Sequence, residues 1–206
     1  MKDEDVAQYL QSNPQFFDAY AAMLAEIAIP HPYGGRTISL SERQLLALRE
    51  KNRELEKKLL DMVQFTQDNA ALQNRVHAFT LTLFGASGFL DVQETAARSL
   101  REMFAVPHVA LHVWKGLPPS AEVLTYTNGL AKPVCTHHPA PETLGWFGEA
   151  APLLRSFAYL PLRDGDTSLG LLVLGSEDPE RFYPDMGTVF LQRIAEAVSS
   201  ALRPSL

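Results

Sequence analysis

The sequence predicts an α+β fold, in which an antiparallel sheet with packed helices follows a long helix and a small N-terminal helical hairpin. Apolar residues recur at helical spacing over residues 3–26 and 39–84, whereas short runs with the period of a strand occur in the second half of the chain. A last helical pattern closes the sequence. With 206 residues, the chain has room for one core-bearing domain of about 120 residues and an appendage.

Residues 3–26 predict two short helices. Apolar side chains recur there every three or four positions, and Asn13-Pro14 interrupts them. Asparagine is a favourable N-cap and proline suits the first helical position, so a second helix is expected to begin at this point. The prolines and glycines of residues 29–35 then end regular structure. We therefore assign residues 1–35 to an N-terminal helical module and its linker.

A long helix is predicted over residues 39–84. Ser39 and Ser41 are each followed, three positions later, by a glutamate or glutamine that can close a capping box. A heptad pattern extends over two and a half repeats, and after Met62 the apolar spacing continues to Leu83 with a three-residue stammer. The a and d positions of the heptads, which we assign to a dimer interface, are Leu45, Leu48, Asn52, Leu55, Leu59 and Met62.

The same helix predicts a homodimer with a parallel coiled coil. A protein of this size has little surface of its own to cover so long a helix, although a helix lying on its own domain is the alternative. In a parallel pair, Asn52 at an a position meets its own copy, so that each amide finds a hydrogen bond. Lys51 at a g position then faces Glu56 at an e position of the second chain, which is an attractive pair.

Residues 85–203 are assigned to the sheet-bearing domain. A helix is expected from Asp91 to Phe104, and a closing helix from Asp185 to Leu202. Two strands are joined by Arg163-Asp164-Gly165-Asp166, which is a hairpin signal. The predicted strands cover residues 109–114, 123–126, 156–162 and 169–175, and residues 129–155 are expected to be irregular with a short helix at 143–150.

Several motifs resemble known families. The strand at 169–175, followed by Phe182 and the closing helix, resembles the C-terminal half of a GAF domain. Asn13-Pro14-Gln15-Phe16-Phe17, then Ile29-Pro30-His31, then Ser39 to Gln44 resemble the bacterial domain of unknown function 484 family, in order and over almost the whole chain. The resemblance implies a GAF-like fold for residues 85–203 in a bacterial protein. It implies no activity, because members of that family have no established one.

GAF domains generally bind small molecules between the sheet and its loops, which here are residues 115–155. Apolar walls with a few polar groups are usual for such pockets. In the alternative, two of the aromatic residues plug the pocket, and the domain is a structural scaffold for protein interactions. The candidate ligand-binding residues are Trp114, Tyr126, Trp146 and Phe147 as walls, and Arg155 as the partner of an anion.

The sequence predicts no enzyme, cofactor or metal site. Cys135, His137 and His138 form its one cluster of soft metal ligands, and three crowded residues are too few for zinc. Nothing in the sequence places an imidazole against the thiol to activate it. Motifs for nucleophilic serine chemistry, nucleotide binding and zinc proteases are missing as well.

The charge and hydropathy of the sequence argue against a nucleic-acid partner and against a membrane-spanning helix. The net charge of −6 gives no field that attracts nucleic acid, and the basic residues of 43–58 alternate with glutamates, so we expect no nucleic-acid partner. No apolar run approaches the ~18 residues of a membrane-spanning helix, and the acidic N-terminus is unlike a secretory signal. We therefore expect a cytoplasmic, non-catalytic sensor or adaptor that forms a homodimer and has a small molecule or a protein as a further partner.

Overall fold

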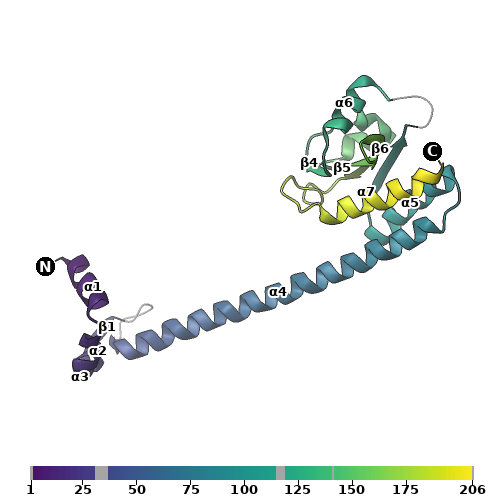
Figure 1. Ribbon diagram of the computed structural model, residues 1–206. Helices are drawn as coiled ribbons and strands as arrows, with labels where there is room; N and C mark the ends of the chain where they lie inside the picture. The colour runs from purple at the N-terminus through teal and green to yellow at the C-terminus, as the bar shows by residue number, and fades with distance from the viewer. Residues whose placement is uncertain (1, 31–36, 115–118, 141, 206) are drawn as a thin grey trace. The chain divides into compact units, whose positions relative to one another are not determined.

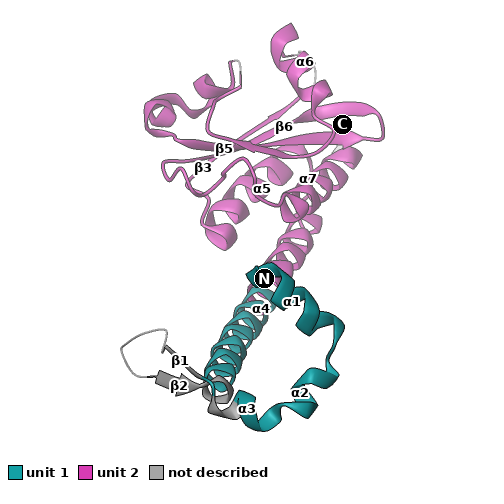
Figure 2. Cartoon of the chain, turned by 90° about the vertical axis from the view of Figure 1, so that its left-hand side faces the viewer, with its two compact units in different colours: residues 1–66 teal, residues 67–206 magenta. Residues whose placement is uncertain are grey.

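The computed structural model describes residues 2–30, 37–114, 119–140 and 142–205 (Figure 1). The chain divides into two compact units, residues 1–66 and 67–206 (Figure 2). None of the described helices has the length and apolar character that crossing a membrane requires.

The N-terminal unit begins with three short helices where the sequence predicted two. Asn13 is not the N-cap that we expected: its side-chain Nδ2 donates to the Tyr9 carbonyl oxygen at 2.9 Å, so it closes the end of the first helix, and Pro14 precedes the second. Two short antiparallel strands flank residues 31–36, which belong to the predicted linker and lie outside the described residues. These elements are α1 (Asp3–Ser12), α2 (Gln15–Ala19), α3 (Ala21–Glu26), β1 (Ala28–Pro30) and β2 (Thr37–Ser39).

The predicted long helix is α4 (Leu40–Phe84), 45 residues long. Its last turns depart from the coiled-coil seam that we expected there. Val76, Phe79 and Leu83 are buried in the core of the C-terminal unit, and the Phe79 ring meets Phe104 edge-on at 5.8 Å. These three positions therefore serve the core of their own domain.

The C-terminal unit is built on a four-stranded antiparallel sheet, which confirms the predicted α+β fold. The strand order is β3-β6-β5-β4. β5 and β6 form the expected hairpin, and Gly165 in its turn has a φ of 58°, a conformation that favours glycine. The strands are β3 (His108–Val113), β4 (Val134–Thr136), β5 (Ser156–Asp164) and β6 (Thr167–Ser176).

Helices cover both faces of this sheet. Side chains alternate along β6, so that Leu172 and Leu174 join the core under α5 (Phe89–Phe104), α7 (Val189–Leu202) and the end of α4. Leu171 and Val173 point to the opposite face, where the second core cluster lies. Because both faces are covered, the strand is apolar at every position of this run, as strands buried on two sides are.

The chain between β3 and β5 differs from the prediction. Residues 123–126, predicted as a strand, lie in α6 (Ala121–Gly129), whose first turn is capped by the Ser120 hydroxyl accepting from the Val123 N–H at 3.3 Å. A short apolar run is compatible with a strand or with a helix, and the Ser120 cap stabilises the helix. The predicted short helix at 143–150 is the 3₁₀ segment η1 (Thr143–Leu153), and a last 3₁₀ turn, η2 (Arg203–Ser205), follows α7.

The close pairing of β3 and β6 predicts a strong effect of Gly170→Ala. A Cβ atom at Gly170 would overlap the carbonyl oxygen of His112 and lie 3.0 Å from the Val113 Cα, both on the neighbouring strand. Since backbone cannot yield as a side-chain tip can, we expect a loss of about 1–3 kcal/mol of unfolding free energy. Urea denaturation would measure it. Gly129→Ala, whose Cβ would meet nothing within 4 Å, is the control, and equal stability of the two variants would contradict the close approach.

Candidate functional site

α4 carries an exposed apolar stripe along the predicted dimer interface. Leu48, Leu59 and Met62 keep 68%, 62% and 66% of their surface exposed, and Leu45 and Leu55 are exposed as well. Asn52, at the polar a position, is also exposed. Exposed apolar surface is unfavourable in water, which makes the stripe a candidate interaction site.

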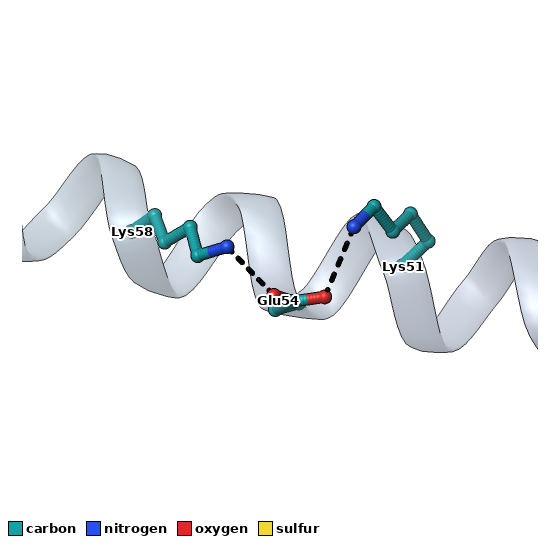
Figure 3. Close-up of polar contacts among 3 residues, drawn as sticks. All are labelled: Lys51, Glu54 and Lys58. Atoms are coloured by element: carbon teal, nitrogen blue, oxygen red, sulfur yellow. Dashed lines mark hydrogen bonds and ion pairs between the residues drawn. The ribbon is translucent and has the colours of Figure 1, made fainter.

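Charged side chains occupy other positions of the same stretch of α4. Lys58 Nζ donates to Glu54 Oε1 at 2.7 Å, and Lys51 Nζ donates to Glu54 Oε2 at 3.3 Å (Figure 3). The bond from Lys58, and then that from Lys51, lowers the pKa of the Glu54 carboxyl. The Lys51 ammonium, which we expected to face Glu56 of a second chain, is thus paired within its own helix. Exposed ion pairs of this kind contribute little free energy. Any association through this stretch of α4 would therefore depend mainly on the apolar side chains of the stripe.

Four of the five predicted ligand-binding residues come together on one face of the sheet. Trp114, Tyr126, Trp146 and Phe147 are half-buried and pack against the second core cluster. α6 and η1 supply three of them, and Trp114 follows β3. The buried members of this cluster are Ala110, Ala140, Leu154, Phe157, Tyr159, Leu171 and Val173.

Aromatic rings fill this face. Trp146 stacks on His112 with ring centroids 3.9 Å apart, and Tyr126 meets Tyr159 edge-on at 5.4 Å. A Cβ atom at Gly175 would lie 3.3 Å from the Phe147 ring, so the missing side chain on β6 leaves the space that Phe147 occupies. The arrangement favours the alternative in which Trp146 and Phe147 plug the pocket.

Desolvation favours the neutral forms of three titratable side chains on the aromatic face. Desolvation, with a smaller contribution from Tyr159, raises the pKa of Tyr126 to about 12. Burial also raises the pKa of Tyr159, whose hydroxyl accepts from the Ala140 N–H at 2.8 Å and lies 3.0 Å from Thr143 Oγ1. Desolvation lowers the pKa of His112. Neutral, desolvated rings suit packing better than acid–base chemistry.

Arg155 lies apart from the other four predicted residues. Its side chain is exposed, and its Nη1 donates to the Pro152 carbonyl oxygen at 3.3 Å. It lines a cavity of 470 Å³ together with His137 and several proline and apolar side chains. Trp114 and Trp146 line a different cavity of 190 Å³. The predicted ligand residues therefore line two separate cavities in place of one shared pocket.

Cys135, His137 and His138 do not converge. Cys135 is buried in β4, while both histidines follow the strand and are exposed. Burial raises the pKa of the Cys135 thiol to about 11, and His137 Nε2 lies 3.0 Å from the Pro179 carbonyl oxygen. Within the described part of the chain, no three His, Cys, Asp or Glu side chains are placed to hold a metal ion.

A third cavity, of 330 Å³, lies on the helical side of the sheet, where the sequence indicated no site. Its walls come from α4, α5, α7 and the segment between β6 and α7. No local motif could have indicated it, because the lining residues are more than a hundred positions apart along the chain, from Leu72 to Ile194.

The buried thiol predicts slow modification of Cys135. With its pKa raised to about 11, roughly one thiol in a thousand is ionised at pH 8, and the thiolate is the reactive species. We expect a disulfide reagent such as DTNB to react at least about a hundredfold more slowly with the native protein than in urea. Equal rates in both conditions would show that the thiol is exposed.

The chain is similar in sequence to a curated protein and in structure to two solved domains. The uncharacterized protein YigA of Salmonella typhimurium is 24% identical over 211 residues, which cover 95% of this chain and 88% of the relative. Two similar solved structures are a GAF domain of an Acinetobacter phosphoenolpyruvate-protein phosphotransferase and a domain of a Sinorhizobium meliloti protein described as a two-component sensor histidine kinase.

The Acinetobacter GAF domain is 13% identical to this chain, with a TM-score of 0.49. The match covers 64% of this chain and 92% of that domain. The sensor kinase domain is 10% identical with a TM-score of 0.41, over 58% of this chain and 94% of that one. The family described as "Protein of unknown function, DUF484" matches residues 1–204. Because this match spans nearly the whole sequence, the chain belongs to the DUF484 family.

Proposed function

We propose that the protein is a non-catalytic cytoplasmic adaptor that works as a homodimer, with α4 as the dimer contact and the GAF-like domain as its regulatory part. One observation carries the proposal: the a and d side chains from Leu45 to Met62 are all exposed on a single helix. Each apolar side chain would contribute about 1.5–3 kcal/mol if a second chain covered it fully. That is enough to hold a dimer against the cost of association.

The pattern of the stripe supports a parallel, in-register pair. In that arrangement Asn52 faces its own copy and each amide is satisfied, whereas an antiparallel pair would set it against a leucine. Lys51 would gain Glu56 of the second chain in exchange for part of its contact with Glu54. A coil whose two chains are in register joins the two regulatory domains through the same helix.

Replacing two leucines of the stripe tests the dimer. We expect the wild type to sediment as a dimer at tens of micromolar, and Leu55→Asp with Leu59→Asp to give monomers, because two carboxylates would be buried at the interface. Leu46→Asp with Leu60→Asp is the matched control, since both leucines are exposed on α4 outside the a and d positions. A monomeric wild type, or dissociation of both double variants, would refute the proposed interface.

Asn52→Cys tests the orientation. In a parallel, in-register dimer the two thiols come within the Cα separation of about 4.4–6.8 Å that a disulfide requires. We expect oxidation to link the chains of this variant on a non-reducing gel, while Arg53→Cys, one position off the seam, links far less. A dimer that forms no crosslink through position 52 would show that its chains are antiparallel or out of register.

Small-molecule sensing is a second candidate function, and the cavity beside Arg155 favours it. Its 470 Å³ lie within the usual range of ligand pockets, and a guanidinium and an imidazole sit among apolar walls. A ligand there would be small and anionic, because the Arg155 side chain is exposed and positively charged.

Mass spectrometry of compounds released from the purified, denatured protein tests this second candidate. We expect an anionic compound that Arg155→Gln loses and Arg49→Gln retains, because Arg49 lies on α4 away from this cavity. Retention of the compound by both variants would count against binding at Arg155.

A further inference from the structure

The cavity on the helical side of the sheet has the build of a ligand site. Its volume of 330 Å³ falls within the lower part of the range of roughly 300–1,000 Å³ for small-molecule pockets. α4, α5, α7, β6 and the segment that leads into α7 all contribute to its walls. Its apolar lining includes Leu100, Phe104, Leu174, Phe182, Leu191 and Ile194.

The charged residues of the lining favour an anion. The charged residues of the lining are two arginines, Arg75 and Arg181, and one aspartate, Asp178, so the lining has a net charge of +1. Asp178 Oδ1 accepts a hydrogen bond from the Glu180 N–H at 2.9 Å, so one oxygen of this carboxylate is already bound by the neighbouring backbone. A carboxylate ligand would thus meet two guanidinium groups and one acid that is already engaged.

Both guanidinium groups have unused donors. Arg181 Nη2 donates to the Phe104 carbonyl oxygen at 2.5 Å, but its Nε is buried and has no hydrogen-bond partner among the described residues. Arg75 is exposed and has no hydrogen bond or ion pair with any described residue. A buried donor without an acceptor is unfavourable, and a carboxylate is the acceptor that arginine binds best, often through two bonds.

We propose that this cavity binds a small carboxylic acid with an apolar body, such as a medium-length alkanoate. The carboxylate lies at Arg75 and Arg181, and the hydrocarbon part enters among the leucine and phenylalanine side chains. The site is on the opposite face of the sheet from Trp146 and Tyr126, so the inference is independent of the cavity beside Arg155 and of the dimer.

Octanoate is a suitable probe, and the five methionines of the chain allow the site to be located. In the 206-residue chain carrying ¹³C-methyl methionine, we expect a saturable shift of the Met186 methyl signal, because Met186 lines the cavity. Met23 and Met62 lie in the N-terminal unit and should not respond. Signals are assigned by replacing each methionine with leucine.

Two comparisons separate the proposed site from general apolar binding. 1-Octanol, which has the same chain without the charge, should bind at least about tenfold more weakly than octanoate. Arg75→Gln should weaken octanoate binding by about tenfold, since it removes one charged donor from the site without breaking a contact that holds the fold. Arg101→Gln, which removes an equal charge from the exposed side of α5, should change it by less than about twofold.

Three results would overturn the proposal. Equal affinity for octanol and octanoate would show that the arginines do not bind the ligand. A Met62 shift that follows the Met186 shift would indicate adsorption to the apolar stripe of α4. A Met186 response in the Leu55→Asp, Leu59→Asp variant that is missing in the wild type would show that a second copy of the chain covers this cavity.

Discussion

The burial of the β5–β6 hairpin from both sides is the constraint on which the C-terminal unit depends. The residues from Leu171 to Leu174 expose at most 1% of their surface, so both faces of the central strands must be covered. α5, α7 and the end of α4 cover one face, and α6 and η1 cover the other. Glycine at positions 170 and 175 lets the neighbouring strand and the Phe147 ring approach. The hydrophobic effect that buries these strands therefore also decides where the helices lie.

The same constraint divides α4 into two stretches with different roles. Val76, Phe79 and Leu83 are needed to close the core, whereas the leucines from Leu45 to Leu59 remain exposed. At 3.6 residues per turn, Leu83 lies roughly a third of a turn around the helix from Leu59. The change in apolar spacing after Met62, which we interpreted as a stammer in one coil, is explained by this change of face. One helix thus contributes both to a folded core and to a surface that a second chain can cover.

The two faces of the sheet offer different chemistry. Neutral rings, most of them with a packing or hydrogen-bond partner, occupy the face where GAF-type ligand pockets are expected. The helical face contains apolar side chains beside two guanidinium groups with free donors. Desolvation disfavours the charged forms of Tyr126, Tyr159 and His112 on the first face, while the cavity on the second has charges that a small anion would complement. The charged lining of the second face is therefore the basis on which we propose a carboxylate ligand there.

Local patterns in the sequence determined the elements, and long-range packing decided the sites. Heptad spacing predicted α4 and its stripe, and two apolar runs around Asp164-Gly165 predicted the hairpin, because each pattern is a property of neighbouring residues. The strand predicted at 123–126 failed because a short apolar run suits a helix equally well, and the Ser120 cap settled it. Among the five predicted ligand residues, four pack in the second core cluster, whereas Arg155 lines a separate cavity beside it, since no spacing records which loops fold over which strand. Arg75 and Arg181 are 106 positions apart in the printed sequence, and only the packing of α4 against the segment before α7 brings them to one cavity.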